Sequence, residues 1–116
     1  MRSRARADRG AVTAEIAVAL PSLVLVVGVA LGAVHAAGAQ VACADAARVG
    51  ARALARGDPD SAVRALTTAT APRGASLHLD RGPDTTRVVV TAPIAAGLPV
   101  PITVHGEAVT PTEPGP

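Results

Sequence analysis

The chain has 116 residues and contains no Phe, Tyr or Trp, whereas Ala alone contributes 27 residues. A chain of this length has room for one ordinary domain, and a core without aromatic side chains must be thin and aliphatic. Residues 1–10 hold four Arg and one Asp, whereas residues 11–116 hold seven Arg and eight acidic residues. Because a nucleic-acid-binding protein needs a basic face on its folded part, this distribution excludes that class of protein.

Residues 1–10 form a basic leader that ends in Arg9 and Gly10, and Glu15 separates this leader from a long apolar segment. An acidic side chain near the start of a helix interacts favourably with the helix dipole. The simplest interpretation of Glu15 is therefore a residue that stabilises the first helical turn.

Residues 16–44 contain no Asp, Glu, Arg or Lys, and residues 16–34 are the most apolar part. At 1.5 Å per residue, 19 to 24 helical residues span roughly 28–36 Å, which matches a hydrocarbon core of about 30 Å. The rest of the chain is too small and too polar to enclose this segment, which predicts a single membrane span. The basic leader predicts a cytoplasmic N-terminus and places everything after His35 outside the cytoplasm. Pro21 is expected to kink the membrane helix rather than to break it.

Small residues recur every four positions within and just beyond this segment, at Gly28, Gly32 and Ala36. Such spacing is typical of a face on which membrane helices pack closely. In a chain so rich in small residues, chance explains the spacing about as well.

The helix is expected to continue as an amphipathic extension to Gly57, with Arg at 48, 52 and 56 on one solvated face and Gly57 as the C-cap. Cys43, the one cysteine of the sequence, lies in this extension. It either forms a disulfide with a second chain or is a small buried residue at a helix contact, and the second interpretation is favoured.

Asp58 and Pro59 have the pattern of an N-cap followed by proline at the first helical position, which predicts a short helix through residue 70. Extended segments are predicted at 75–80, 85–94 and 101–111, with a turn at 81–84 that joins the first two into a hairpin. The tail at 111–116 is expected to be disordered. The predicted fold class is α+β: a long N-terminal transmembrane helix with a short helix and a small antiparallel β-sheet. The predicted parts are a leader at 1–10, a helix at 11–57 and a small extracytoplasmic domain at 58–116.

No set of residues has the pattern of a catalytic or metal site. His35, His78 and His105 are far apart in the sequence, and no acidic pair has the spacing of metal ligands or of an acid and a base. The sequence also lacks the G-x-S-x-G, P-loop and C-x-x-C motifs. We therefore expect neither enzymatic activity nor a metal, a cofactor or a small-molecule substrate.

Two alternatives concern the fate of the N-terminal segment. Ala37, Gly38 and Ala39 offer an A-x-A pattern, and signal peptidase cleavage after Ala39 would release a secreted protein of 77 residues. The apolar segment is longer than the roughly 7–15 residues usual in a signal peptide, and a signal peptide has no need of Glu15. The other alternative is an unprocessed domain anchored by a single span.

Residues 9–15, Arg-Gly-Ala-Val-Thr-Ala-Glu, followed by an uninterrupted apolar segment, resemble the type III signal of type IV pilins and related pseudopilins. That resemblance implies cleavage after Gly10 by a prepilin peptidase on the cytoplasmic side, which makes Ala11 the new N-terminus. It also implies that Glu15, the fifth mature residue, pairs with the amine of a neighbouring subunit and sets the axial register. Ile16 departs from the family, which commonly has Phe at this position.

The leader, the helical sequence CADAARVGARALARGD at 43–58 and the Pro-rich sequence at 88–111 together resemble the TadE-like minor pilins, or pseudopilins, of tight-adherence (Flp) pilus systems. The resemblance covers nearly the whole chain. It implies a non-catalytic subunit that takes part in assembly of a Tad-type (Flp) type IV pilus for adherence. The implied partners are the prepilin peptidase, other pilins or pseudopilins and the pilus assembly platform. The implied location is the bacterial cytoplasmic membrane, and the cell-surface pilus after assembly.

Overall fold

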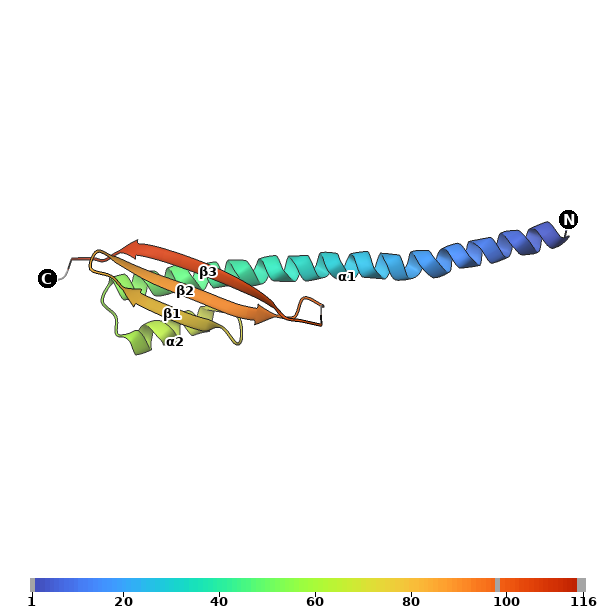
Figure 1. Cartoon of the computed structure of the whole chain (residues 1–116). Coiled ribbons are helices and arrows are strands. Elements are labelled where there is room, and N and C mark those ends of the chain that lie inside the picture. Colours follow the sequence, from blue (N-terminus) through green and yellow to red (C-terminus); the bar gives the residue numbers. More distant parts are fainter. Residues whose placement is uncertain (1, 98, 115–116) are drawn as a thin grey trace.

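The computed structural model describes residues 2–97 and 99–114, and the last two residues of the expected disordered tail lie outside this range. The molecule is a rod with extents of 93 × 20 × 17 Å. One helix, α1 (Arg2–Ala55), runs along nearly all of it, and the remaining elements pack against the C-terminal part of α1 (Figure 1). Residues 3–31 of α1 are all exposed.

Helix α1 is longer than predicted, because it begins inside the basic leader rather than after it. Ala and Arg are both strong helix formers, and Gly10 alone costs only about 1 kcal/mol in a helix interior. The helix also continues through Pro21, and Figure 1 shows α1 as gently curved, with no sharp kink along its length. Next to this proline, the Ser22 hydroxyl donates a hydrogen bond of 2.8 Å to the carbonyl of Val18.

The C-terminal end of α1 is closed by Gly57, as the sequence predicts. Gly57 has a φ of 85°, a left-handed conformation that costs little without a Cβ. Its N–H donates to the carbonyl of Leu54, and the N–H of Asp58 donates to the carbonyl of Ala53. These two bonds form a Schellman motif, which satisfies carbonyl groups that the helix itself leaves free.

Helix α2 (Asp60–Thr70) starts one residue later than the cap pattern predicts. Pro59, with a ψ of 149°, is the N-cap and makes no side-chain cap hydrogen bond, so Asp58 is not the cap. An extended Pro59 cannot occupy the first helical position, but its carbonyl accepts hydrogen bonds from the N–H groups of Ala62 and Val63. Asp60 then supplies the acidic side chain of the first turn, where the helix dipole favours it.

Three antiparallel strands form one sheet in the order β1-β2-β3. They are β1 (Ser76–Arg81), β2 (Thr85–Ile94) and β3 (Ile102–Pro111). The central strand β2 alternates between exposed and buried side chains, as expected for a sheet with one face on a core. Beyond β3, the N–H groups of Thr112 and Glu113 donate to the carbonyls of Asp84 and Ala55, so the chain stays attached past the predicted strand end.

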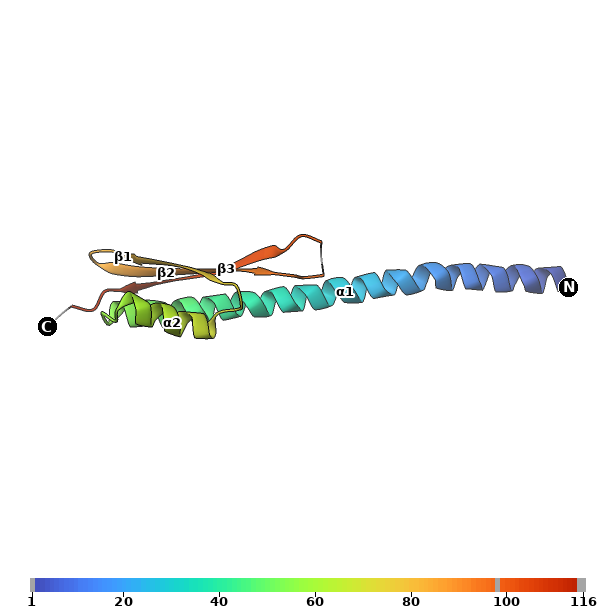
Figure 2. The same ribbon diagram turned by 90° about the horizontal axis from the view of Figure 1, so that it is seen from below.

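The sheet and the two helices form two layers (Figure 2). The core between them contains mainly Ala and Val from α1 and β2, and its largest fully buried side chains include Leu54, Val63, Val88 and Val90. Small residues allow this thin core to close. A Cβ on Gly106 of β3 would meet the backbone nitrogen of Ala44 and lie 2.5 Å from its Cα, so strand and helix backbones are in direct contact. The predicted α+β fold class is confirmed.

Candidate functional site

The N-terminal half of α1 exposes a continuous apolar surface. Its large side chains are exposed around the whole helix, and they include Val12, Ile16, Val18, Leu20, Leu23, Val24, Leu25, Val26, Val27, Val29, Leu31 and Val34. A helix that is apolar on all sides is stable in water only if protein covers it, and nothing in the described residues covers this one. It is the one helix in the described part of the chain that is long and apolar enough to cross a membrane.

The predicted processing and register residues lie at the N-terminal end of this apolar surface. Gly10, Ala11 and Glu15 are all exposed on α1. A Cβ on Gly10 would meet no atom within 4 Å, so packing within the chain does not require glycine there. Within residues 2–97 and 99–114, Glu15 forms no ion pair. The carboxylate is therefore free to meet a group from another molecule.

The small residues at four-residue spacing divide between two environments. Gly28 is open, with no atom within 4 Å of a Cβ built on it. Gly32 instead faces the chain itself, because a Cβ there would lie 2.6 Å from the carbonyl oxygen of Ala96 in the β2–β3 loop. Ala36 is partly buried and packs against the core. Gly32 and Ala36 thus serve a contact inside the chain, and only Gly28 remains free for another helix.

Cys43 is fully buried where α1 meets β3. Burial raises the pKa of its thiol above the usual value, which keeps it protonated and unreactive at neutral pH. The backbone of β3 at Gly106 covers this turn of α1. A disulfide with a second chain would therefore require the domain to open.

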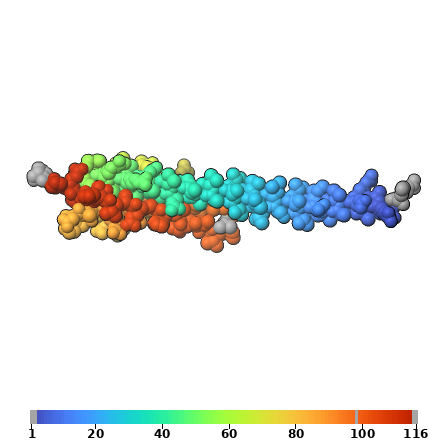
Figure 3. All heavy atoms as spheres, turned by 90° about the horizontal axis from the view of Figure 1, so that it is seen from above, coloured from blue at the N-terminus to red at the C-terminus, as the bar shows by residue number. Residues whose placement is uncertain are grey.

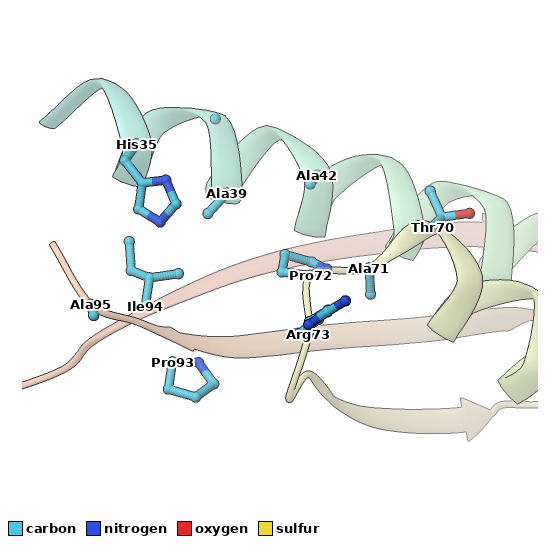
Figure 4. A pocket seen from close by; sticks show the side chains of 11 residues that line it. His35, Ala39, Ala42, Thr70, Ala71, Pro72, Arg73, Pro93, Ile94 and Ala95 are labelled. Atoms are coloured by element: carbon cyan, nitrogen blue, oxygen red, sulfur yellow. The ribbon is translucent and has the colours of Figure 1, made fainter. Parts of the chain in front are cut away.

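An open cavity of about 540 Å³ lies where α1, the α2–β1 connection and the end of β2 come together. Figure 4 shows His35 pointing into it from α1 and Arg73 approaching from the α2–β1 connection. The other lining residues are small or apolar except Thr70, and none is acidic. His35, Thr70 and Arg73 are thus the polar side chains among its lining residues.

The three histidines lie on different elements: His35 on α1, His78 on β1 and His105 on β3. Within the described residues, no group of three or more His, Cys, Asp or Glu side chains could hold a metal ion.

Arg81 is a structural residue that the sequence alone does not reveal. It lies at the end of β1, and its guanidinium donates to the carbonyls of Leu54 and Asp58 and to the carboxylate of Asp60. The three acceptors belong to the end of α1, the connection between the helices and the start of α2. One planar group with several N–H donors thus joins both helices to the sheet. An isolated arginine in a turn sequence carries no signal of this role.

Comparison with known proteins finds one relative that covers most of the chain. The sequence is 39% identical over 101 residues to the Mycobacterium tuberculosis protein named "Apoptosis inhibitor Rv3655c", which covers 87% of this chain and 78% of the relative. The chain belongs to the family of that protein. No protein-family model matches the sequence. No solved structure matches it either.

Proposed function

We propose that the chain is a non-catalytic minor pilin or pseudopilin, processed after Gly10 and used in assembly of a Tad-type (Flp) pilus. The observation that carries the proposal is the exposed carboxylate of Glu15 directly before the exposed apolar segment of α1, five residues after Gly10. In this arrangement α1 crosses the cytoplasmic membrane once, with its N-terminus in the cytoplasm and the domain outside.

The energetic cost of an unpaired charge at the membrane edge favours pairing of Glu15 with a cation from another subunit. A charged side chain at the centre of a membrane costs about 2.5–3.5 kcal/mol on insertion scales, and one at the edge costs less but still some energy. Cleavage after Gly10 creates an α-amino group on Ala11, a cation about 7.5 Å along the helix from the start of the apolar segment at Ile16. Pairing of this amine with the Glu15 carboxylate of the next subunit neutralises both charges as the helices stack.

The packing of α1 also supports processing at Gly10 over secretion. Cleavage after Ala39 would cut α1 at a residue that packs against the core. Residues around Gly10 pack against nothing else in the described chain, so a peptidase can bind them without disturbing the fold.

The first test is the N-terminus of the mature protein, determined by mass spectrometry of the full chain purified from its own host. We expect Ala11 as the first residue, and we expect Gly10→Val to leave the leader attached. The matched control is Ala37→Leu, which spoils the A-x-A pattern at an exposed position. A mature N-terminus at Gln40 that is lost in Ala37→Leu would establish secretion instead, and an intact leader in the wild type would establish simple anchoring.

The second test addresses the register role. Glu15→Ala is expected to be cleaved normally but to reduce incorporation into, or initiation of, pili, counted by electron microscopy. Thr13→Ala, which changes an exposed side chain that bonds only to the carbonyl of Arg9, is the control. Normal piliation in Glu15→Ala would show that the carboxylate does not set the register.

The name of the relative supplies a second candidate function, inhibition of apoptosis. The 39% identity favours it for this chain as well, through action on a host cell. It is tested by exposing host cells to bacteria that carry or lack the chain and counting apoptotic cells. Equal counts would exclude the second candidate.

A further inference from the structure

The loop between β2 and β3 is unusually apolar for an exposed connection. Residues 88–106 contain no Asp, Glu, Arg or Lys, and residues 94–102 consist entirely of aliphatic residues, Gly and Pro. Val100 is 69% exposed and Ile102 is 37% exposed at the end of this loop. An exposed apolar loop on a small domain indicates a surface that something else covers.

The position of the loop along α1 identifies what covers it. Ala96 contacts α1 at Gly32, inside the apolar segment at 16–34. At 1.5 Å per residue, Gly32 lies only about 3 Å below the end of that segment. Figure 3 shows the loop (orange) as the part of the domain that reaches furthest along α1 toward its N-terminus. If α1 spans a bilayer, the loop is therefore level with the outer edge of the hydrocarbon.

The groups next to the loop suit a lipid surface. An apolar groove of about 200 Å³ lies between the loop and α1, lined by Val29, Gly32, Ala33, Ala36, Ala96 and Ile102. His35 and Arg73 border the neighbouring cavity, which has no acidic lining residue. A headgroup layer is roughly 5–7 Å thick on each side of the hydrocarbon. The groove thus lies within the apolar segment of α1, and His35 follows one residue past the end of that segment, inside the headgroup layer.

We propose that the β2–β3 loop inserts into the outer leaflet of the bilayer, with Val100 and Ile102 at the boundary between acyl chains and headgroups. The loop and α1 then attach the domain to the membrane at two points. This inference rests on the membrane span of the proposed function. The occupant is lipid rather than a second protein because the loop surface is continuous with the apolar surface of α1.

The absence of native tryptophan makes a direct test possible. The full chain is reconstituted in vesicles of phosphatidylcholine with phosphatidylglycerol, carrying one tryptophan at Val100→Trp, Leu25→Trp or Val109→Trp. Val109 is the matched control, because it is 51% exposed but lies at the other end of the sheet, on β3. We expect blue-shifted emission and strong quenching by lipids brominated near the headgroup for Val100→Trp. Val109→Trp should emit as in water and remain unquenched.

The three variants separate the possible failures. Water-like, unquenched emission from Val100→Trp, with quenching of Leu25→Trp, would overturn the loop proposal and leave the membrane span intact. Blue-shifted emission of Val100→Trp without lipid quenching would overturn it in favour of a protein neighbour. Leu25 lies at the middle of the apolar segment, so Leu25→Trp is tested with lipids brominated deep in the acyl chains, and lack of quenching by these lipids would overturn both the loop proposal and the span.

Folding of each variant is checked by the protection of Cys43 from alkylation, since the thiol is fully buried in the closed domain. If Val100→Trp fails this check, Ile102→Trp takes its place, with the same expected emission and quenching.

Discussion

Replacing Gly106 by alanine is expected to separate β3 from α1. The new Cβ would meet the backbone nitrogen of Ala44 and the backbone carbon of Cys43, and neither atom can rotate away as a flexible side chain can. Overpacking a closed core costs typically 1–3 kcal/mol, and contact with helix backbone places this case near the upper end. Removing a glycine from a strand returns roughly 0.5–1 kcal/mol. The net destabilisation is therefore about 2 kcal/mol.

The buried thiol of Cys43 reports this change directly. In the full chain in detergent micelles, an alkylating reagent reaches Cys43 only when the domain opens, so the labelling rate follows the open population. A loss of about 2 kcal/mol in the free energy of opening raises the open population roughly 30-fold, and the rate of Cys43 labelling rises by the same factor.

Gly38→Ala is the control for the same chemical change. A Cβ on Gly38 meets no atom within 4 Å, and alanine is the better helix former, so labelling should be unchanged or slower. If Gly106→Ala labels at the wild-type rate, direct contact between the backbones of β3 and α1 is not what closes the domain.

Two further predictions concern Arg81 and Cys43. Arg81→Ala should lower the free energy of unfolding by about 1–2 kcal/mol in urea titrations followed by circular dichroism, because the carbonyls of Leu54 and Asp58 lose a charged donor. Arg81→Lys should restore only part of the lost free energy of unfolding, since an ammonium cannot reproduce the several N–H donors of the planar guanidinium. Full recovery would contradict the role of Arg81 in joining both helices to the sheet. Burial raises the pKa of Cys43, so the unfolded thiol loses its proton first and stability should fall as the pH rises above 9.0. Cys43→Ala should remove this pH dependence of the free energy of unfolding between about pH 8 and pH 10. An unchanged pH dependence would show that another group causes it.

The strands were predictable from sequence to within one residue at each end. β2 is the clearest case: its β-branched residues and the turn at 81–84 before it predict a strand at 85–94, which is where the structure has one. The start of α1 was not predictable, because charge marked the leader as a separate part while its helix-forming residues simply continue the helix.

The contacts between elements could not be predicted from the sequence either. Gly106 and Gly50 look alike in the sequence, yet one lies against helix backbone and the other against Thr67 and Val88. Gly32 belonged to a spacing typical of contacts between helices, but its neighbour is a loop of its own chain. Spacing along a helix defines a face, whereas the partner of that face depends on how the chain folds back.

The uninterrupted course of α1 also links the direction of Glu15 to that of the domain. With 3.6 residues per turn, inserting one residue between them would turn the carboxylate by about 100° around the helix axis and move it by about 1.5 Å. Inserting seven residues would restore the direction of the carboxylate to within about 20° while lengthening α1 by roughly 10 Å. Under the proposed register role of Glu15, the angular position of this one carboxylate would decide which way every domain in a stack of subunits faces, and a single added residue would rotate the outer surface of the assembly.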